Sequence, residues 1–536
     1  MKKQTLFILF LSLSFFSFAQ KQKPSQPKLV VGIVVDQMRY DYLYKYWEKY
    51  GDGGFRKLLN KGFNCKNTTL DYIPAVTAAG HAAIYTGAPP GVNGIISNDW
   101  YVRKAGRRGN CVLDTSETPA FFSPCNMLTT TITDELRLSD NLKSRVIGIA
   151  LKERAAILPA GHLANGCYWL DQKTNKWVSG KYYMKEVPKW VNDFNAQQYV
   201  SKYLSKPWTT LLPIEQYTES IADDNEFEGL QPGETKPVFP HNLPAISKGD
   251  TAAALRLTPF ANTLTKDFAK EAIVQEKLGM GGVCDFITIS FSSTDLIGHL
   301  YAPQSVEVED TYLRLDKDLE NLINFLEKNI GKNNFLLFLT ADHGAALNPS
   351  YMTSKNIPAG YVHSAVIKDS LQNFLVNVYG KGDWVADVYT DQVYLNHEQI
   401  ETKRLNIYNI QRQVADYMTR LTGVQTAFTT YMLTNSSYES GAGHLAQRGY
   451  NPQRSGDVII IQEPGWLENA KKTGTNHGGV YSYDQHVPLL WYGWNIKNGS
   501  SVEDVSVTDI APTIAAMLNI SFPNGCTGKP IPALFK

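Results

Sequence analysis

The chain has 536 residues, with 52 lysines and arginines against 51 aspartates and glutamates, so its formal net charge is only +1. This balance excludes binding to nucleic acid or to an anionic membrane by bulk charge, because such proteins carry a strongly basic domain or tract. With 43% hydrophobic and 12% aromatic residues, the chain can bury a large core, and any anion that it handles must be met at a local site.

The first twenty residues have the pattern of a secretory signal peptide. Lys2 and Lys3 precede an apolar run, and the small residues Ser17 and Ala19 flank Phe18, which predicts cleavage after Ala19. A membrane anchor is the alternative, although the apolar stretch is short for a membrane span. We therefore expect residues 1–19 to be removed and the mature protein to be periplasmic or secreted, without a membrane anchor.

Five apolar, β-branched runs lack two-residue alternation, as expected of strands that are covered on both faces. They lie at 28–35, 144–151, 285–291, 334–340 and 487–493. Helical patterns lie between them, most clearly at 305–330, and a Thr/Asp cap precedes an apolar helix at 508–520. This alternation predicts an α/β fold with a doubly wound, mostly parallel sheet flanked by helices.

Three further segments interrupt this pattern. Residues 166–180 predict a hairpin of aromatic strands, and 206–250 read as a long loop. Residues 351–454 hold helices and short strands between two core strands, which predicts an inserted cap subdomain. The catalytic domain would then consist of residues 20–350 together with 455–536.

Six cysteines are spread singly along the chain without a CxxC pair. They are Cys65, Cys111, Cys125, Cys167, Cys284 and Cys526. An even number of cysteines in an exported protein favours disulfides over zinc knuckles. We therefore expect some disulfide pairing, with buried free thiols as the alternative, and the sequence does not choose among the pairings.

Carboxylates and imidazoles are concentrated near the ends of the predicted strands. The residues concerned are Asp36, Asp295, His299, Asp342, His343 and His477. Ligands of an open parallel sheet gather at the carboxyl ends of its strands, so we expect these side chains along one edge. Mixed imidazole and carboxylate ligands without thiolate suit zinc. Six protein ligands suit two ions, and two-metal sites are used in phosphate chemistry.

The segment IPAVTAAGHAAIYTGAPPGVNGI at 73–95 predicts a helix from Thr77 to Tyr85. Thr77 can cap this helix, or its hydroxyl can act as a nucleophile where the helix N-terminus favours an anion. Both roles stay open on local sequence. His81 is expected to face the helix packing and His486 to be structural, while His363, His397 and His444 fall in the predicted cap without an assigned role.

Taken together, these residues resemble the alkaline phosphatase superfamily, and in particular its secreted bacterial branch with a threonine nucleophile, the PafA-like alkaline phosphatases. The resemblance extends from VVDQMRYDYL to VTDIAPTIAAMLNI and includes YTGAPPGVNGI, which is similar to a turn in nucleotide pyrophosphatase/phosphodiesterases. It implies that Thr77 is the nucleophile. It also implies one zinc ion at Asp36, Thr77, Asp342 and His343, and a second at Asp295, His299 and His477.

The resemblance further assigns Asn98, Lys152 and Arg154 to the phosphate oxygens. On local sequence Lys152 and Arg154 read as a solvated strand edge, but PafA-like enzymes place a lysine, an arginine and an asparagine around the phosphate. A point charge and a planar guanidinium suit the dianion of a phosphate monoester. Phosphodiesterase relatives generally lack this cationic pair, so the resemblance favours monoesters.

The resemblance thus implies an exported enzyme with two zinc ions that hydrolyses a broad range of phosphate monoesters through a phosphothreonine. A phosphodiesterase or nucleotide pyrophosphatase on the same fold is the main alternative, and a non-catalytic exported zinc-binding protein is another. A sulfatase is disfavoured because TAAGH lacks the required cysteine or serine, and a phosphoglycerate mutase relative because that work is cytosolic. We expect small-molecule phosphate monoesters as partners, no nucleic acid partner, and a monomer.

Overall fold

The computed structural model describes residues 26–248, 250–469 and 471–535. The predicted signal peptide lies outside these residues. Within the described ranges, no helix combines the length and apolar character needed to cross a bilayer.

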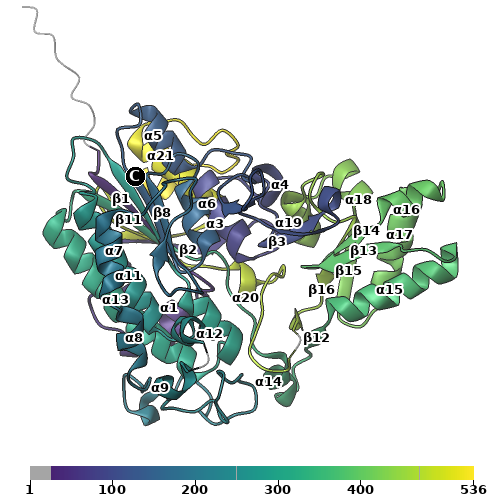
Figure 1. Ribbon diagram of the computed structural model, residues 1–536, viewed down its shortest axis with the longest axis horizontal. Helices are drawn as coiled ribbons and strands as arrows, with labels where there is room; N and C mark the ends of the chain where they lie inside the picture. Colours follow the sequence, from purple (N-terminus) through teal and green to yellow (C-terminus); the bar gives the residue numbers. More distant parts are fainter. Residues whose placement is uncertain (1–25, 249, 470, 536) are drawn as a thin grey trace, which may run out of the picture.

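A nine-stranded sheet in the described residues forms the centre of the molecule, in the order β19-β2-β18-β11-β1-β10-β7-β8-β9 (Figure 1). Its five central strands run parallel. They are β11 (Phe335–Thr340), β1 (Leu29–Val35), β10 (Asp285–Phe291), β7 (Val146–Ala150) and β8 (Gly166–Leu170). Every residue of these five strands is buried, in agreement with their lack of alternation. The predicted α/β fold with a mostly parallel sheet is confirmed.

The outer strands account for the antiparallel part of the sheet. β18 (Leu489–Gly493) runs antiparallel to both β11 and β2 (Phe63–Thr69), and β19 (Gly499–Ser506) closes this edge beside β2. At the other edge β9 (Trp177–Val178) pairs antiparallel with β8, which confirms the aromatic hairpin predicted at 166–180. Because β18 runs opposite to β11, its first residue lies at the edge where the parallel strands end.

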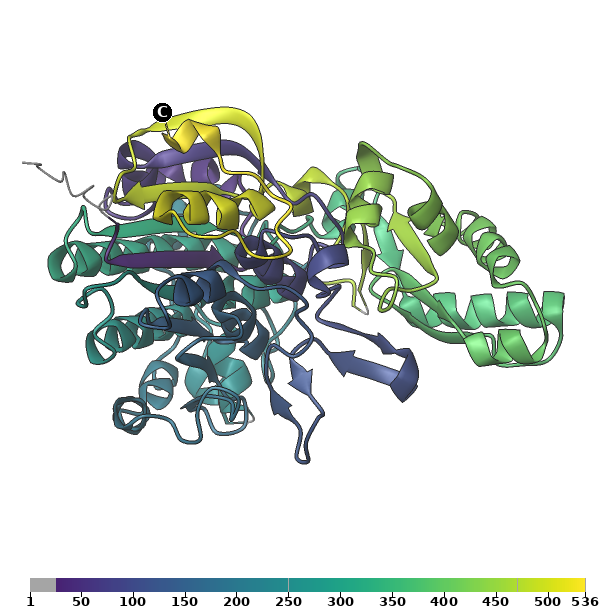
Figure 2. The ribbon, with the colours of Figure 1, turned by 90° about the horizontal axis from the view of Figure 1, so that it is seen from above.

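Helices cover both sides of the sheet (Figures 1 and 2). The long predicted helix is α13 (Val306–Asn329), which packs against α11 (Phe260–Gln275). The helix that begins at Thr77 is α3 (Thr77–Thr86), and it packs against α6 (Glu153–Ala160) and α21 (Ile510–Leu518). All ten residues of α3 are buried, because it crosses the interior of the protein.

A second, four-stranded sheet stands beside the main one (Figure 2). Its order is β13 (Val385–Tyr389), β14 (Gln392–Leu395), β16 (Val458–Gln462) and β15 (Val424–Thr429). It has a core of its own, in which α15 (Ser364–Tyr379) and α17 (Ile407–Met418) bury their apolar faces. β16 lies beyond residue 454, so we propose that the insertion continues through Gln462.

A hairpin of β3 (Asp99–Val102) and β4 (Arg107–Asn110) connects the main domain to this insertion. Arg108 donates two hydrogen bonds to the Asp387 carboxylate, at 2.6 and 3.0 Å. Arg103 donates a hydrogen bond at 3.0 Å to Asp457. Ion pairs at both points therefore hold the insertion over the edge of the main sheet.

The predicted disulfide pairing is wrong, because all six cysteines are free. Cys65 lies in β2 and Cys167 in β8, in opposite halves of the sheet, and both are fully buried among apolar side chains. Burial raises the pKa of the Cys65 thiol to about 12. These cysteines act as small apolar residues of the core, which is a common role of buried free thiols.

Candidate active site

The three predicted carboxylates meet at the carboxyl edge of the main sheet. Asp36 follows β1 directly, Asp342 lies two residues after β11, and Asp295 lies in the first turn of α12 (Ser293–Tyr301), which follows β10. Their exposures are 0%, 0% and 2%. The loop that precedes β18 brings His477 to the same edge, because β18 is antiparallel to its neighbours.

The three predicted histidines lie against these carboxylates. His299 Nε2 is 3.1 Å from Asp295 Oδ1 and 3.2 Å from His477 Nε2. His343 Nε2 is 3.5 Å from Asp36 Oδ1, and the rings of His343 and His477 stack with centroids 3.5 Å apart. The structure therefore brings all six predicted ligands into one site.

Backbone carbonyls fix the orientation of the three imidazoles. The Nδ1 atoms of His299, His343 and His477 lie 2.9, 2.9 and 2.7 Å from the carbonyl oxygens of Thr475, Gly344 and Ala75, to which they can donate. Each ring thus presents Nε2 to the carboxylates. This second contact is typical of metal-binding histidines, since it selects the tautomer whose Nε2 can act as a ligand.

The residues fit divalent metal ions. Ligand atoms of Asp295, His299 and His477 lie within 4.8 Å of one another, and so do those of Asp36, Asp295 and His343. Three buried atoms that face this site have no hydrogen-bond partner among the described residues, namely Asp36 Oδ1, Asp342 Oδ2 and His343 Nε2. Buried polar atoms are normally paired, so these three point to a ligand. The donor set of carboxylates and imidazoles suits zinc.

The charges of the site also favour cations. Burial, followed by the carboxylates of Asp295 and Asp342, holds the pKa of Asp36 well above its ordinary range. Burial lowers the pKa of His343 to about 3, so its imidazole is neutral, which is the form that binds a metal. Lys152 Nζ donates hydrogen bonds to Asp36 Oδ2 at 2.7 Å and to Asp295 Oδ2 at 2.5 Å. The raised pKa of Asp36 means that the protein's own cationic groups do not fully balance three ionised carboxylates, and a bound cation would.

Thr77 lies at the centre of this arrangement. It is the first residue of α3, whose N-cap is Val76, and no side chain caps the helix. Its hydroxyl lies 3.4 Å from Lys152 Nζ. A Cβ at Gly80 would come within 2.3 Å of the Asp342 carbonyl oxygen, so only glycine lets α3 pack this closely on the loop after β11. Because no side chain caps α3, the Thr77 hydroxyl is not used as a cap. It lies beside Lys152 and faces the carboxylate cluster.

Asn98 and Arg154 lie around the same point. Asn98 Oδ1 accepts a hydrogen bond at 2.9 Å from the Ala78 N–H in the first turn of α3, which fixes the amide beside Thr77. Arg154 Nε is buried without a hydrogen-bond partner. Burial alone would lower the pKa of Arg154, but acidic neighbours, including Glu153, Asp36 and Asp295, raise it above its ordinary value. A half-buried, charged guanidinium whose Nε has no hydrogen-bond partner among the described residues is suited to an anionic ligand.

Two further residues support the site. Gln37 has a left-handed backbone (φ 65°), and it donates from Nε2 to Asp295 Oδ1 at 2.7 Å and from its backbone N–H to Asp342 Oδ1 at 3.2 Å. His81 Nδ1 is 2.9 Å from the Thr77 carbonyl oxygen and 3.1 Å from Asp342 Oδ2. In the sequence, only the position of His81 one turn after Thr77 indicates a role in the site. For Gln37, only its place next to Asp36 does so.

The remaining histidines lie elsewhere. His486 stacks on Tyr40, and its Nε2 is 2.9 Å from the Lys66 carbonyl oxygen, so its role is structural. His397 pairs with Asp457 at 2.8 Å inside the insertion. None of His363, His397, His444 and His486 belongs to the groups that could hold a metal ion in the described residues.

Comparison with known proteins identifies the family to which the chain belongs. The family model described as type I phosphodiesterase / nucleotide pyrophosphatase matches residues 30–485, and the chain belongs to this family. Alkaline phosphatase PafA of Elizabethkingia meningoseptica is 42% identical over 94% of each chain. Alkaline phosphatase PhoV of Synechococcus elongatus is 42% identical over 96% of this chain and 94% of its own. A protein of Myroides odoratus named calcium-transporting ATPase is 45% identical over 96% of each chain.

Solved structures of PafA have the same fold as this chain. The crystal structure of wild-type PafA has a TM-score of 0.92 at 42% identity and covers 95% of this chain and 99% of its own. A PafA variant in which a threonine, an asparagine, a lysine and an arginine are replaced has a TM-score of 0.91 at 40% identity, over 96% of this chain and 99% of its own. Within the alkaline phosphatase superfamily, the chain is therefore an enzyme of the PafA-like alkaline phosphatase type.

Proposed function

We propose that this enzyme hydrolyses phosphate monoesters through a covalent phosphothreonine at Thr77, with two zinc ions, and that the diester alternative is not its main activity. The observation that carries the proposal is the convergence of the Thr77 hydroxyl, the Lys152 ammonium group and the carboxylate and imidazole cluster at one edge of the sheet.

The solved PafA variant supports the choice of residues. Its replaced threonine and asparagine are 21 positions apart, as Thr77 and Asn98 are, and its replaced lysine and arginine are two positions apart, as Lys152 and Arg154 are. The same four residue types thus recur at the same spacings. We propose that Asn98, Lys152 and Arg154 contact the phosphoryl oxygens here.

We assign one zinc ion to Asp36, Thr77, Asp342 and His343, and the other to Asp295, His299 and His477. When bound, such ions lower the pKa of a nearby hydroxyl or water and stabilise a departing oxygen. Asp295 belongs to both groups of ligand atoms that lie close together. Gln37 holds Asp295 and Asp342 in place through the hydrogen bonds described above, and His81 Nδ1 lies beside Asp342 Oδ2.

The reaction follows from the positions of the chain's own groups. The Thr77 hydroxyl gives up its proton to solvent, and its oxygen attacks phosphorus while the bond to the leaving group breaks on the opposite side. The departing oxygen takes a proton from water and leaves as the alcohol. Lys152, Arg154 and the Asn98 amide balance the negative charge that is spread over the three remaining oxygens in the transition state. Water then attacks the phosphothreonine, and inorganic phosphate departs while Thr77 regains its proton.

Other parts of the sequence prediction remain proposals. We propose that the chain is exported after cleavage behind Ala19 and acts as a monomer on small phosphate monoesters. The inserted cap, extended here through Gln462, is proposed to shape the space in which the leaving alcohol lies.

Replacement of Arg154 tests whether the enzyme prefers phosphate monoesters. Arg154→Ala is expected to lower kcat/KM for phenyl phosphate about 100-fold, because a monoester dianion loses a bidentate, charge-assisted contact. The loss for methyl phenyl phosphate should be below about threefold, since a diester carries one charge and fewer free oxygens. Steady-state kinetics with both substrates measures this difference.

The matched control is Arg107→Ala, which removes an exposed arginine from the β4 strand. It should leave both values within about twofold of the wild type, as most exposed substitutions do. Equal losses for monoester and diester in Arg154→Ala would contradict the assignment.

A further inference from the structure

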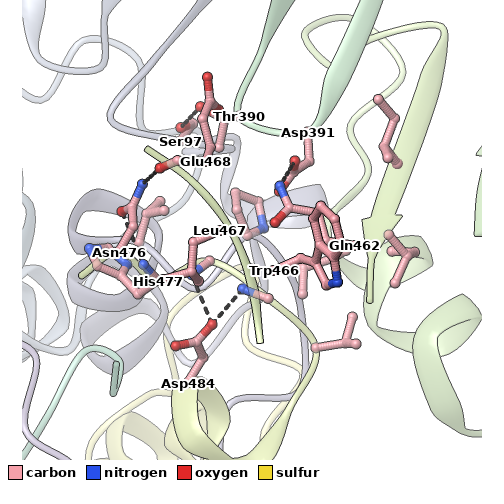
Figure 3. A pocket seen from close by; sticks show the side chains of 18 of the residues that line it. Ser97, Thr390, Asp391, Gln462, Trp466, Leu467, Glu468, Asn476, His477 and Asp484 are labelled. Carbon is pink, nitrogen blue, oxygen red and sulfur yellow. Dashed lines mark hydrogen bonds between the residues drawn. The ribbon is translucent and has the colours of Figure 1, made fainter. Parts of the chain in front are cut away.

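A cavity of about 390 Å³ opens from the active site toward the insertion. One end is lined by Asn98, His299 and His477, and the other by residues of the insertion and of the segment that follows it. Figure 3 shows His477 and Asn476 on one side of this space and Asp391, Gln462 and Trp466 on the other. We call it the leaving-group pocket.

The lining of the leaving-group pocket is acidic and aromatic. It includes the carboxylates of Asp391, Glu468 and Asp484 and the ring of Trp466, and none of its described lining residues is a lysine or an arginine. Arg108, which stacks on the Tyr389 ring at 4.0 Å, is already paired with Asp387. The phosphate side of the active site holds Lys152 and Arg154, whereas no such cation lines the described part of the leaving-group pocket.

The turn that carries Asp391 is conformationally unusual. Thr390 and Asp391 join β13 to β14, and both have a left-handed backbone, with φ of 47° and 55°. Threonine is β-branched and rarely adopts this conformation, so the turn stores strain, as residues at functional sites often do. The Thr390 hydroxyl lies 3.5 Å from the Ser97 hydroxyl, next to Asn98. The turn thus holds Asp391 at the mouth of the active site.

No described residue places a compensating cation beside Asp391. Gln462 Nε2 donates a hydrogen bond to Asp391 Oδ1, but this amide is neutral. Burial, followed by the charge of Glu468, raises the pKa of Asp391 to about 7. Two carboxylates beside an aromatic ring form a surface that attracts ammonium groups, both by charge and by the cation–π interaction.

We propose that the leaving-group pocket selects phosphate monoesters whose alcohol carries an ammonium group. The inference rests on the proposed function, in which the departing oxygen lies at the Asp295, His299 and His477 end. The alcohol must then extend from that end, where His299 and His477 line the pocket, toward Asp391, Glu468 and Trp466. The pocket would disfavour leaving groups that carry carboxylates or further phosphates.

The test uses two substrates of the same shape and different charge, choline phosphate and 3,3-dimethylbutyl phosphate, with the zinc-loaded full chain. The measured quantity is the ratio of their kcat/KM values, so that effects common to both substrates cancel. Asp391→Asn is expected to lower this ratio about tenfold, the size of one partly screened charge contact. Glu468→Gln should act in the same direction, and Trp466→Leu should lower the ratio about threefold.

Asp391→Asn should fold normally, because asparagine tolerates a left-handed backbone and keeps the oxygen that accepts from Gln462. The matched control is Glu401→Gln, which removes an exposed carboxylate of the insertion outside the pocket and should leave the ratio within about twofold. An unchanged ratio in Asp391→Asn and Glu468→Gln, with both substrates hydrolysed, would overturn the inference alone. Hydrolysis of neither substrate would overturn the proposed function as well.

Discussion

Thr77→Ala is expected to lower kcat/KM for phenyl phosphate by more than about 10⁴-fold, because it removes the proposed nucleophile and with it the covalent step. The helix should not suffer, since alanine is a strong helix former and the threonine hydroxyl does not cap α3. The assay is release of phosphate from the purified, zinc-loaded variant, with metal content measured on the same sample.

Thr77→Ser is the matched control. It keeps a hydroxyl at the same position and should retain far more activity than the alanine variant. Acid quenching of the wild type during turnover should trap phosphate on Thr77, and the same treatment of Thr77→Ala should trap none. Substantial phosphatase activity in Thr77→Ala, with zinc bound, would remove the covalent step from the account.

Removal of metal is expected to have the second largest effect. A chelator should lower phosphatase activity by more than about 10³-fold, because the buried carboxylates then repel the phosphate and the attacking oxygen is not activated. Zinc should restore activity at two ions per chain. Calcium and magnesium should restore little, since they prefer sites made mostly of oxygen.

Ligand variants distinguish the two proposed ions. His299→Ala should reduce the bound zinc from two ions per chain to about one, because His299 belongs to only one of the two ligand groups. His363→Ala removes an exposed histidine of the insertion and should leave the zinc content at two. Activity that survives complete chelation would contradict the metal assignment.

Much of the site could be predicted because its residues lie next to strands that the sequence shows clearly. β1 and β11 are almost continuous apolar runs, β10 is mostly apolar, and Asp36, Asp295 and Asp342 follow their carboxyl ends. The topology of a parallel sheet is enough to bring such residues together. The role of Lys152 and Arg154 could not be predicted from local sequence, which indicates only a charged strand edge. It was inferred from the resemblance to the family.

The remaining features depend on tertiary contacts that have no local signature. The order of the outer strands, with β18 antiparallel between β2 and β11, is set by pairing between segments far apart in the chain. Gln37 supports Asp295 through a left-handed backbone that its residue type does not suggest. The cysteines are free because they lie far apart in the chain's structure: four are buried in the core, whereas Cys125 is exposed and Cys526 is partly exposed.

The preference for monoesters over diesters is measured most directly by the ratio of kcat/KM for phenyl phosphate to that for methyl phenyl phosphate on the zinc-loaded wild-type chain. We predict a ratio above about 10², because Lys152, Arg154 and Asn98 stabilise three free oxygens of a dianion. A ratio near or below one would contradict the account and identify the enzyme as a phosphodiesterase.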